Sequence, residues 1–238
     1  MALSRDVPWP RLIAESIAIV GSILLAFTID AWWEERLERN DEQEQLGRLL
    51  IEFEANFERI DNFGIIEGAL SASLEVFDQI EVAQREGADT VDVSVDQIAL
   101  LTIAPTYEAD SPVLEGLIRS GRLEIIQSQG VIAALASWER TLRDYAEVAL
   151  LARTNAEAVL IPGLVRRGDI GVALVRSARA PNGLDEAVSS KLAISIDTEI
   201  KGLIAQKISN TSHANRLLGD ARAAAEGVVA TLRAEIKD

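Results

Sequence analysis

The sequence contains no cysteine and a single histidine, His213, among its 238 residues. Without cysteine the chain forms no disulfide bond, thiolate nucleophile or cysteine-based metal site. His213 has no second histidine at ligand spacing and no acid nearby in the sequence, so we interpret it as a solvated or interhelical residue. We therefore expect no enzyme activity, no metal and no cofactor.

Basic and aromatic residues are also scarce. The chain has 23 Lys and Arg against 38 Asp and Glu, a formal net charge of −15. This charge repels nucleic acid and anionic lipid headgroups, which excludes nucleic acid as an expected partner. Hydrophobic residues make up 48% of the chain but aromatic ones only 5%, and the abundance of Ala and Leu favours helices over strands. We predict an all-α fold.

Residues 12–33 form one almost entirely apolar segment that nevertheless contains Glu15 and Asp30. As a helix, these 22 residues cover about 33 Å, close to the roughly 30 Å thickness of a bilayer's hydrocarbon core. We predict a transmembrane helix with the lipid bilayer as its surroundings. Tryptophans flank the segment where interfacial aromatic belts lie, and the expected membrane-interface anchors are Trp9, Trp32 and Trp33.

Two other interpretations of this segment stay open. A cleavable signal peptide normally has an uninterrupted apolar core and a small-x-small cleavage site, whereas Glu15 interrupts the core and no Ala-x-Ala follows it. A buried helix of a soluble domain is the second alternative, because the run free of charge, Ser16 to Ile29, is only 14 residues long. The membrane span accounts for more of the pattern, since each acid then lies only about 4 Å inside the boundary.

The two acids also share one face of the expected helix, about 60° apart. Small residues spaced by four accompany them, which allows another helix to approach closely. The predicted packing face consists of Arg11, Glu15, Ala18, Ser22, Ala26 and Asp30. We predict that it packs against a second copy of the chain or a span of another membrane subunit. The alternative is that the small residues recur by chance and both acids merely extend to water.

Beyond the apolar segment the helical pattern continues with charged residues. Residues 34–45 contain six acids, two arginines and neither Gly nor Pro, which predicts a solvated helix. Apolar residues then return with the spacing of a coiled coil or bundle, at Leu46, Leu50, Phe53, Phe57 and Ile60. We divide the chain into a tail with the transmembrane helix, 1–33, a helical stalk, 34–62, and an extended antiparallel helical bundle, 63–238.

Glycine and proline mark the expected helix ends within 63–238. The breaks fall at Gly64, Gly87, Ser120-Gly121, Pro162-Gly163 and Pro181-Asn182-Gly183. A long amphipathic helix is expected over 131–160, and one or two helices over much of 184–236. Residues 91–95 alternate between apolar and polar, but Ser94 and Gln97 also fit a capping box. We expect a connector and a short helix there, because a lone strand would have no partner.

Trp138 and Tyr145 lie seven residues apart on one side of the long helix, so we expect them in the core. Four arginines form a basic segment in this acidic chain, Arg166, Arg167, Arg176 and Arg179. One interpretation is an acidic partner or lipid headgroup. The favoured one is a solvated loop or ion pairs with acids of a neighbouring helix.

Part of the chain resembles an uncharacterised family of bacterial membrane proteins with a domain of unknown function. The similar residues include Gly21, Leu24, Leu25, Ala26, Asp30, Trp33 and Glu35-Arg36, and later Tyr107, Leu117, Ser120, Gly121, Leu123 and Ile126. The family's span ends in an Asn-Trp-Asn-Glu-like motif, whereas residues 30–35 here read Asp-Ala-Trp-Trp-Glu-Glu. The resemblance implies one span and a helical extramembrane domain, and it implies no activity.

Positive charge does not decide the orientation, because Arg5 and Arg11 precede the span and Arg36 and Arg39 follow it. An uncleaved signal anchor with a short cytoplasmic tail is the simplest arrangement. We expect a single-pass protein of the bacterial inner membrane with a periplasmic domain. The predicted function is a membrane-anchored helical scaffold or sensor-like interaction protein, associating with itself or a partner through span and stalk. The alternative is an accessory subunit of a larger membrane complex.

Overall fold

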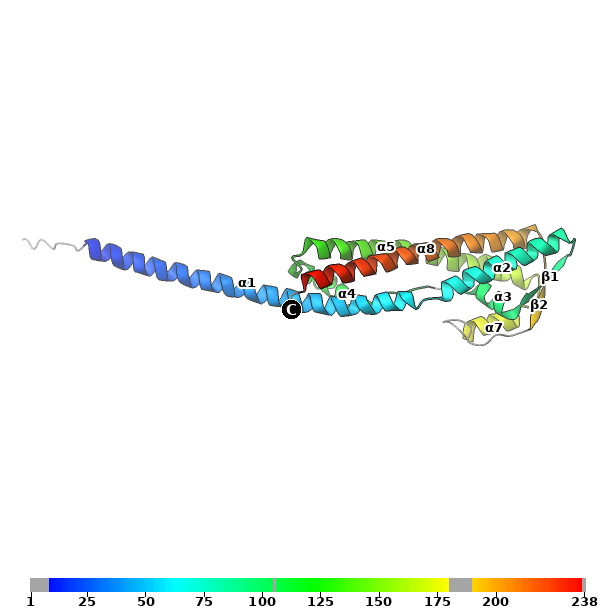
Figure 1. The fold of residues 1–238 in the computed structure, drawn as a ribbon, viewed down its shortest axis with the longest axis horizontal. Coiled ribbons are helices and arrows are strands. Elements are labelled where there is room, and N and C mark those ends of the chain that lie inside the picture. The colour runs from blue at the N-terminus through cyan, green and yellow to red at the C-terminus, as the bar shows by residue number, and fades with distance from the viewer. Residues whose placement is uncertain (1–8, 105, 180–189, 237–238) are drawn as a thin grey trace, which may run out of the picture.

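The computed structural model describes residues 9–104, 106–179 and 190–236, with the side chains of 9–14 and 16 left undescribed. Most described residues are helical, which confirms the all-α prediction. Figure 1 shows a long rod with a single helix projecting from one end. The elements are α1 Trp9–Asp61, α2 Ile65–Arg85, β1 Thr90–Ser94, α3 Val95–Thr102, α4 Pro112–Arg119, η1 Arg122–Ile125, α5 Gln129–Asn155, η2 Ala156–Leu160, α6 Ile161–Val165, α7 Gly171–Arg179, β2 Lys191–Ser195 and α8 Thr198–Glu235.

Helix α1 runs for 53 residues, so the apolar segment and the expected stalk form one continuous helix. The described side chains from Ile17 to Asn40 are exposed, and one face becomes buried from Glu42 onward. The stretch expected to be a stalk therefore has two parts. Residues 34–40 project freely, while the rest of α1 belongs to the bundle (Figure 1).

The bundle has three long legs that lie side by side. Helices α1 and α2 form the first leg, α5 with η2 and α6 the second, and α8 the third. Helix α8 packs against α5, α1 and α2, and thus ties the legs together along their whole length (Figure 1). One core cluster, around Phe53, Trp138 and Leu218, fills the half nearer the projecting helix, and a second, around Ile80, Ile98 and Ile200, fills the distal half.

A small antiparallel sheet at the distal end corrects the expectation for residues 91–95. Strand β1 pairs with β2, and Val91 lies opposite Ile194. The prediction of a connector was wrong because the partner strand lies about 100 residues later, in a region expected to be helical. The capping box of Ser94 and Gln97 is confirmed and begins α3 directly after the strand.

The expected end of the long helix at Pro162-Gly163 is also wrong. After α5 the chain makes a π-helical turn, η2, and continues as α6 to Val165. Pro162 lies in the first turn of α6, where a missing N–H is tolerated. The breaks at Gly64, Gly87 and Ser120-Gly121 are found where predicted, and Gly87 and Gly121 have positive φ. The turn predicted at 181–183 lies outside the described residues.

Two described helical stretches are long and apolar enough to cross a membrane. The apolar window in the first, near the beginning of the chain, is 0% buried, whereas the window in Gln129–Val165 is 33% buried. The second stretch contains Trp138 and Tyr145 and serves as a core helix of the bundle. The first stretch has the composition and the exposure of a span.

Candidate functional site: a groove held by α1

Helix α1 holds the loop before α4 by means of buried polar side chains. The Glu52 carboxylate accepts hydrogen bonds from the backbone N–H groups of Val113, at 2.5 Å, and Leu114, at 3.2 Å. Ser111, the residue that precedes α4, makes no side-chain cap. Glu52 therefore caps α4 from a different helix, and its negative charge lies at the favourable end of the helix dipole.

One turn further along α1, Asn56 binds the same loop and is only 1% exposed. Its Nδ2 donates to the Asp110 carbonyl at 2.8 Å, and its Oδ1 accepts from the Asp110 N–H at 3.1 Å. The Tyr107 hydroxyl donates to Asn56 Oδ1 at 3.1 Å, and the Tyr107 N–H donates to the Tyr145 hydroxyl at 2.9 Å. Residues 107–114 are thus fixed to α1 on one side and to α5 on the other.

Burial sets the electrostatics of this network. Desolvation raises the pKa of Glu52, although the two backbone N–H groups from α4 partly offset it by stabilising the carboxylate. Desolvation also raises the pKa of Tyr107 to about 12 and raises the pKa of Tyr145. Both phenols therefore stay neutral near pH 7 and act as hydrogen-bonding groups.

A groove of about 500 Å³ lies between this fixed loop and α5. Its lining comprises Tyr107, Glu108, Ala109, Ser111, Leu114, Glu115, Trp138, Glu139, Leu142, Arg143 and Ala146. Three exposed acids and the exposed Arg143 surround the apolar residues at the centre. The groove can receive a ligand or a segment of another protein.

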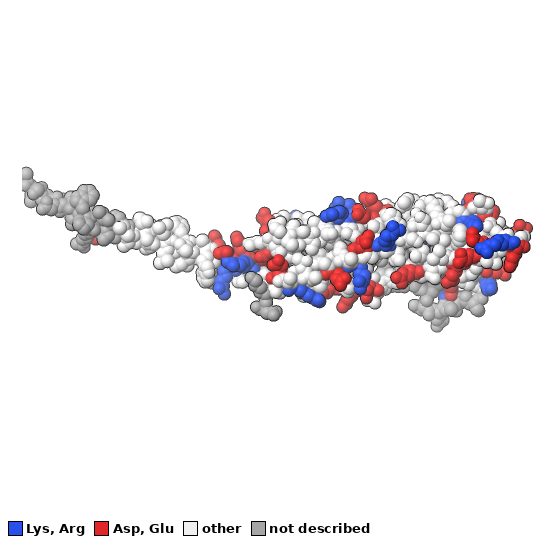
Figure 2. All heavy atoms as spheres, turned by 45° about the horizontal axis from the view of Figure 1, so that its top comes forward, with Lys and Arg blue, Asp and Glu red and all other residues white. Residues whose placement is uncertain are grey.

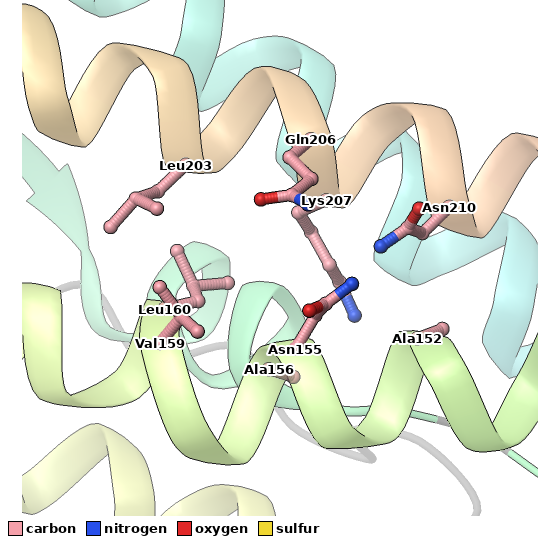
Figure 3. A pocket seen from close by; sticks show the side chains of 9 residues that line it. All are labelled: Ala152, Asn155, Ala156, Val159, Leu160, Leu203, Gln206, Lys207 and Asn210. Atoms are coloured by element: carbon pink, nitrogen blue, oxygen red, sulfur yellow. The ribbon is translucent and has the colours of Figure 1, made fainter.

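A second, much smaller pocket lies between α8 and the α5–η2 junction (Figure 3). Lys207 enters it from α8 and is 4% exposed, and Asn155 and Asn210 point toward the same space (Figure 3). The free volume of about 10 Å³ has room for roughly one water molecule. Burial lowers the pKa of Lys207 to about 8.

Lys207 has a structural partner in this pocket. Its Nζ donates to the carbonyl of Ile103, the residue that caps the end of α3. A cation at the carboxyl end of a helix is favoured by the helix dipole. Lys207 thus connects α8 to α3, and the pocket is too small for anything larger than a solvent molecule.

The described residues of the predicted span face, Glu15, Ala18, Ser22, Ala26 and Asp30, are all exposed on the projecting part of α1. The Ser22 hydroxyl donates to the Ile19 carbonyl at 2.8 Å, within the same helix. Trp32 and Trp33 are exposed, and the Arg36 guanidinium lies over the Trp32 ring. The side chains of Trp9 and Arg11 lie outside the described residues. Figure 2 shows this stretch as largely uncharged, in contrast to the bundle.

The expectations for the bundle residues are largely confirmed. Trp138 and Tyr145 are buried in the core. Arg167 pairs with Asp197 and Glu199 at the start of α8, and Arg176 pairs with Asp96, which agrees with the favoured interpretation of the basic segment. Sequence reasoning missed Glu52 and Asn56. The available signal was that both positions belong to the buried face of α1 that the apolar spacing outlines.

The fold and site define the class as a helical-bundle protein with one long, exposed, apolar helix and a groove fixed to that helix. No known protein family, curated protein or solved structure matches the chain. The resemblance to an uncharacterised bacterial membrane family therefore stays a prediction.

Proposed function

We propose that the protein is a membrane-anchored interaction protein that acts as a scaffold or sensor. In this proposal α1 is the single span of a bacterial inner-membrane protein, and the bundle lies in the periplasm. The observation that carries it is the continuity of α1, whose exposed apolar part leads without a break into the bundle core. No flexible linker separates the anchor from the domain.

This continuity places the bundle at a defined height above the bilayer. From Trp33 to Asp41 the helix rises about 12 Å, and from Asp41 to Arg85 the first leg rises roughly 66 Å further. The acidic bundle is repelled by anionic headgroups, which favours an upright rod. The groove wall is attached to α1 through Glu52 and Asn56, so any tilt of the span also moves the groove.

Introduced cysteines provide the test of this topology, because the natural chain has none. Ser4→Cys, Ser22→Cys and Ser137→Cys place one thiol in the tail, the span and the exposed face of α5. We expect a membrane-impermeant maleimide, added to cells with a permeabilised outer membrane, to label only Ser137→Cys. Ser4→Cys should react after lysis and Ser22→Cys only after detergent is added. Labelling of Ser22→Cys in intact membranes would exclude a span, and labelling of Ser137→Cys only after lysis would reverse the orientation.

We further propose that the span face of Ser22, Ala26 and Asp30 packs against another span. Small side chains there permit close approach of a second helix. Purification in a mild detergent followed by mass determination distinguishes the two partners. A multiple of 25.8 kDa indicates self-association, and a fixed second species indicates an accessory subunit of a larger complex. A strictly monomeric chain in every mild detergent would contradict both.

A further inference from the structure

The groove between the 107–115 segment and α5 has an apolar floor. Ala109, Leu114, Leu142 and Ala146 line it, with the nearly buried Trp138 beneath. Its volume of about 500 Å³ lies within the range of roughly 300–1,000 Å³ typical of ligand sites. A floor of this kind binds apolar side chains by removing them from water.

The rim of the groove is predominantly acidic. Glu108, Glu115 and Glu139 surround the floor, against a single cation, Arg143. Glu115 is already paired with Arg119, which is highly exposed and partly neutralises it. The remaining negative charge of Glu108 and Glu139 attracts a cation and repels an anion at this position.

The groove is built in advance of any ligand. Its loop wall is fixed at the main chain by Asn56 and Glu52 and at Tyr107 by Tyr145, and its other wall is the core helix α5. A wall held by several buried hydrogen bonds loses little conformational freedom when a ligand binds. The site therefore favours a ligand that matches its existing shape and charge.

We propose that this groove binds a short segment of a partner protein that places apolar side chains on the floor and lysine or arginine against Glu108 and Glu139. The proposal rests on the proposed function and names the kind of partner that an interaction protein of this shape recruits. A second bundle of the same chain is a poor occupant, because each copy carries a net charge of −15.

Trp138 provides a direct probe, since it lines the groove and is the only tryptophan of the chain outside α1. Replacing Trp9, Trp32 and Trp33 with phenylalanine leaves its fluorescence as the single tryptophan signal. The full chain in detergent is titrated with acetyl-Lys-Leu-Ala-Leu-Lys-amide and, separately, with acetyl-Glu-Leu-Ala-Leu-Glu-amide. We expect a saturable change with the basic peptide that weakens as salt is added, and none with the acidic peptide.

Variants at the rim and floor test the site itself. Glu108→Gln combined with Glu139→Gln should raise the Kd for the basic peptide by roughly threefold to tenfold, the range expected for two exposed ion pairs. Ala146→Trp should abolish binding by filling the groove. The matched control is Glu147→Gln, which removes an exposed acid of α5 that does not line the groove and should leave the Kd unchanged.

Three results would overturn the proposal: equal binding of both peptides, a double variant with an unchanged Kd, or undiminished binding by Ala146→Trp. An absent fluorescence response is checked by calorimetry, and absence of heat as well counts against the site. Because the titration uses detergent-solubilised chain, its failure and a failure of the topology experiment are distinguishable.

Discussion

Lys207 is a buried cation whose removal should change the pH dependence of stability. Burial lowers its pKa from 10.5 to about 8 in the folded chain, a shift worth at most about 3 kcal/mol at 1.36 kcal/mol per unit. Because the folded state disfavours the charged form, this penalty is fully present below pH 8. It declines as the pH rises through 8 toward 10.5 and is absent above that value. The hydrogen bond to the Ile103 carbonyl favours the charged form and reduces the net penalty.

In Lys207→Met an apolar side chain of similar length replaces the lysine and does not titrate. Compared with this variant, the wild-type chain should gain up to about 3 kcal/mol of stability between pH 8 and 10.5. At pH 7 the variant should be about as stable as the wild type or more stable, because the lost bond to Ile103, about 1.5–3 kcal/mol, offsets the relieved penalty.

Urea unfolding followed by circular dichroism, at several pH values from 7 to 10.5, measures this difference directly. Other groups titrate in the same interval, but they contribute equally to both proteins and cancel in the difference. Lys191→Met, at an exposed lysine of β2, is the matched control and should give a nearly constant difference from wild type. A constant difference for Lys207→Met as well would refute the reasoning from burial.

Three further outcomes follow from other features. Asn56→Leu should destabilise the bundle by about 3 kcal/mol in urea unfolding, because it leaves buried loop N–H and C=O groups unpaired, and a loss below 0.5 kcal/mol would contradict the role assigned to Asn56. Gly168→Ala would place a Cβ 2.7 Å from a backbone oxygen and should lower the Tm, whereas Gly116→Ala, with open space around it, should raise it slightly. In sedimentation experiments in detergent, Ser22→Ile should reduce the assembled mass while Leu24→Ile, on the opposite face, should not.

The sequence pattern predicts the helices well because their signals are local. The spacing of Leu46, Phe53 and Ile60 predicts the face of α1 that the bundle buries, and the capping box at Ser94 predicts the beginning of α3. Strands β1 and β2 escape prediction because their pairing joins residues about 100 positions apart. Pro162 misleads because the π-helical turn before it lets the helix continue.

The candidate groove is harder to predict for a related reason. Its two walls come from segments about 30 residues apart in the sequence, and the side chains that fix the loop wall come from α1, more than 50 residues earlier than that loop. Glu52 and Asn56 are polar residues on an apolar face, a pattern that equally fits the edge of an exposed helix. Only the fold places them opposite the unpaired backbone groups that they satisfy.

The same buried bonds decide how α1 can transmit motion. Sliding α1 along the bundle by even one residue, about 1.5 Å, would break the bonds of Glu52 to Val113 and Leu114 and those of Asn56 to Asp110 together. Each lost bond leaves a buried polar group unpaired at about 1–3 kcal/mol, so a sliding mechanism costs a large part of a typical domain's stability. Tilting or rotating the whole rod breaks none of them. A signal that passes between the membrane and the groove must therefore move the bundle as one body with α1.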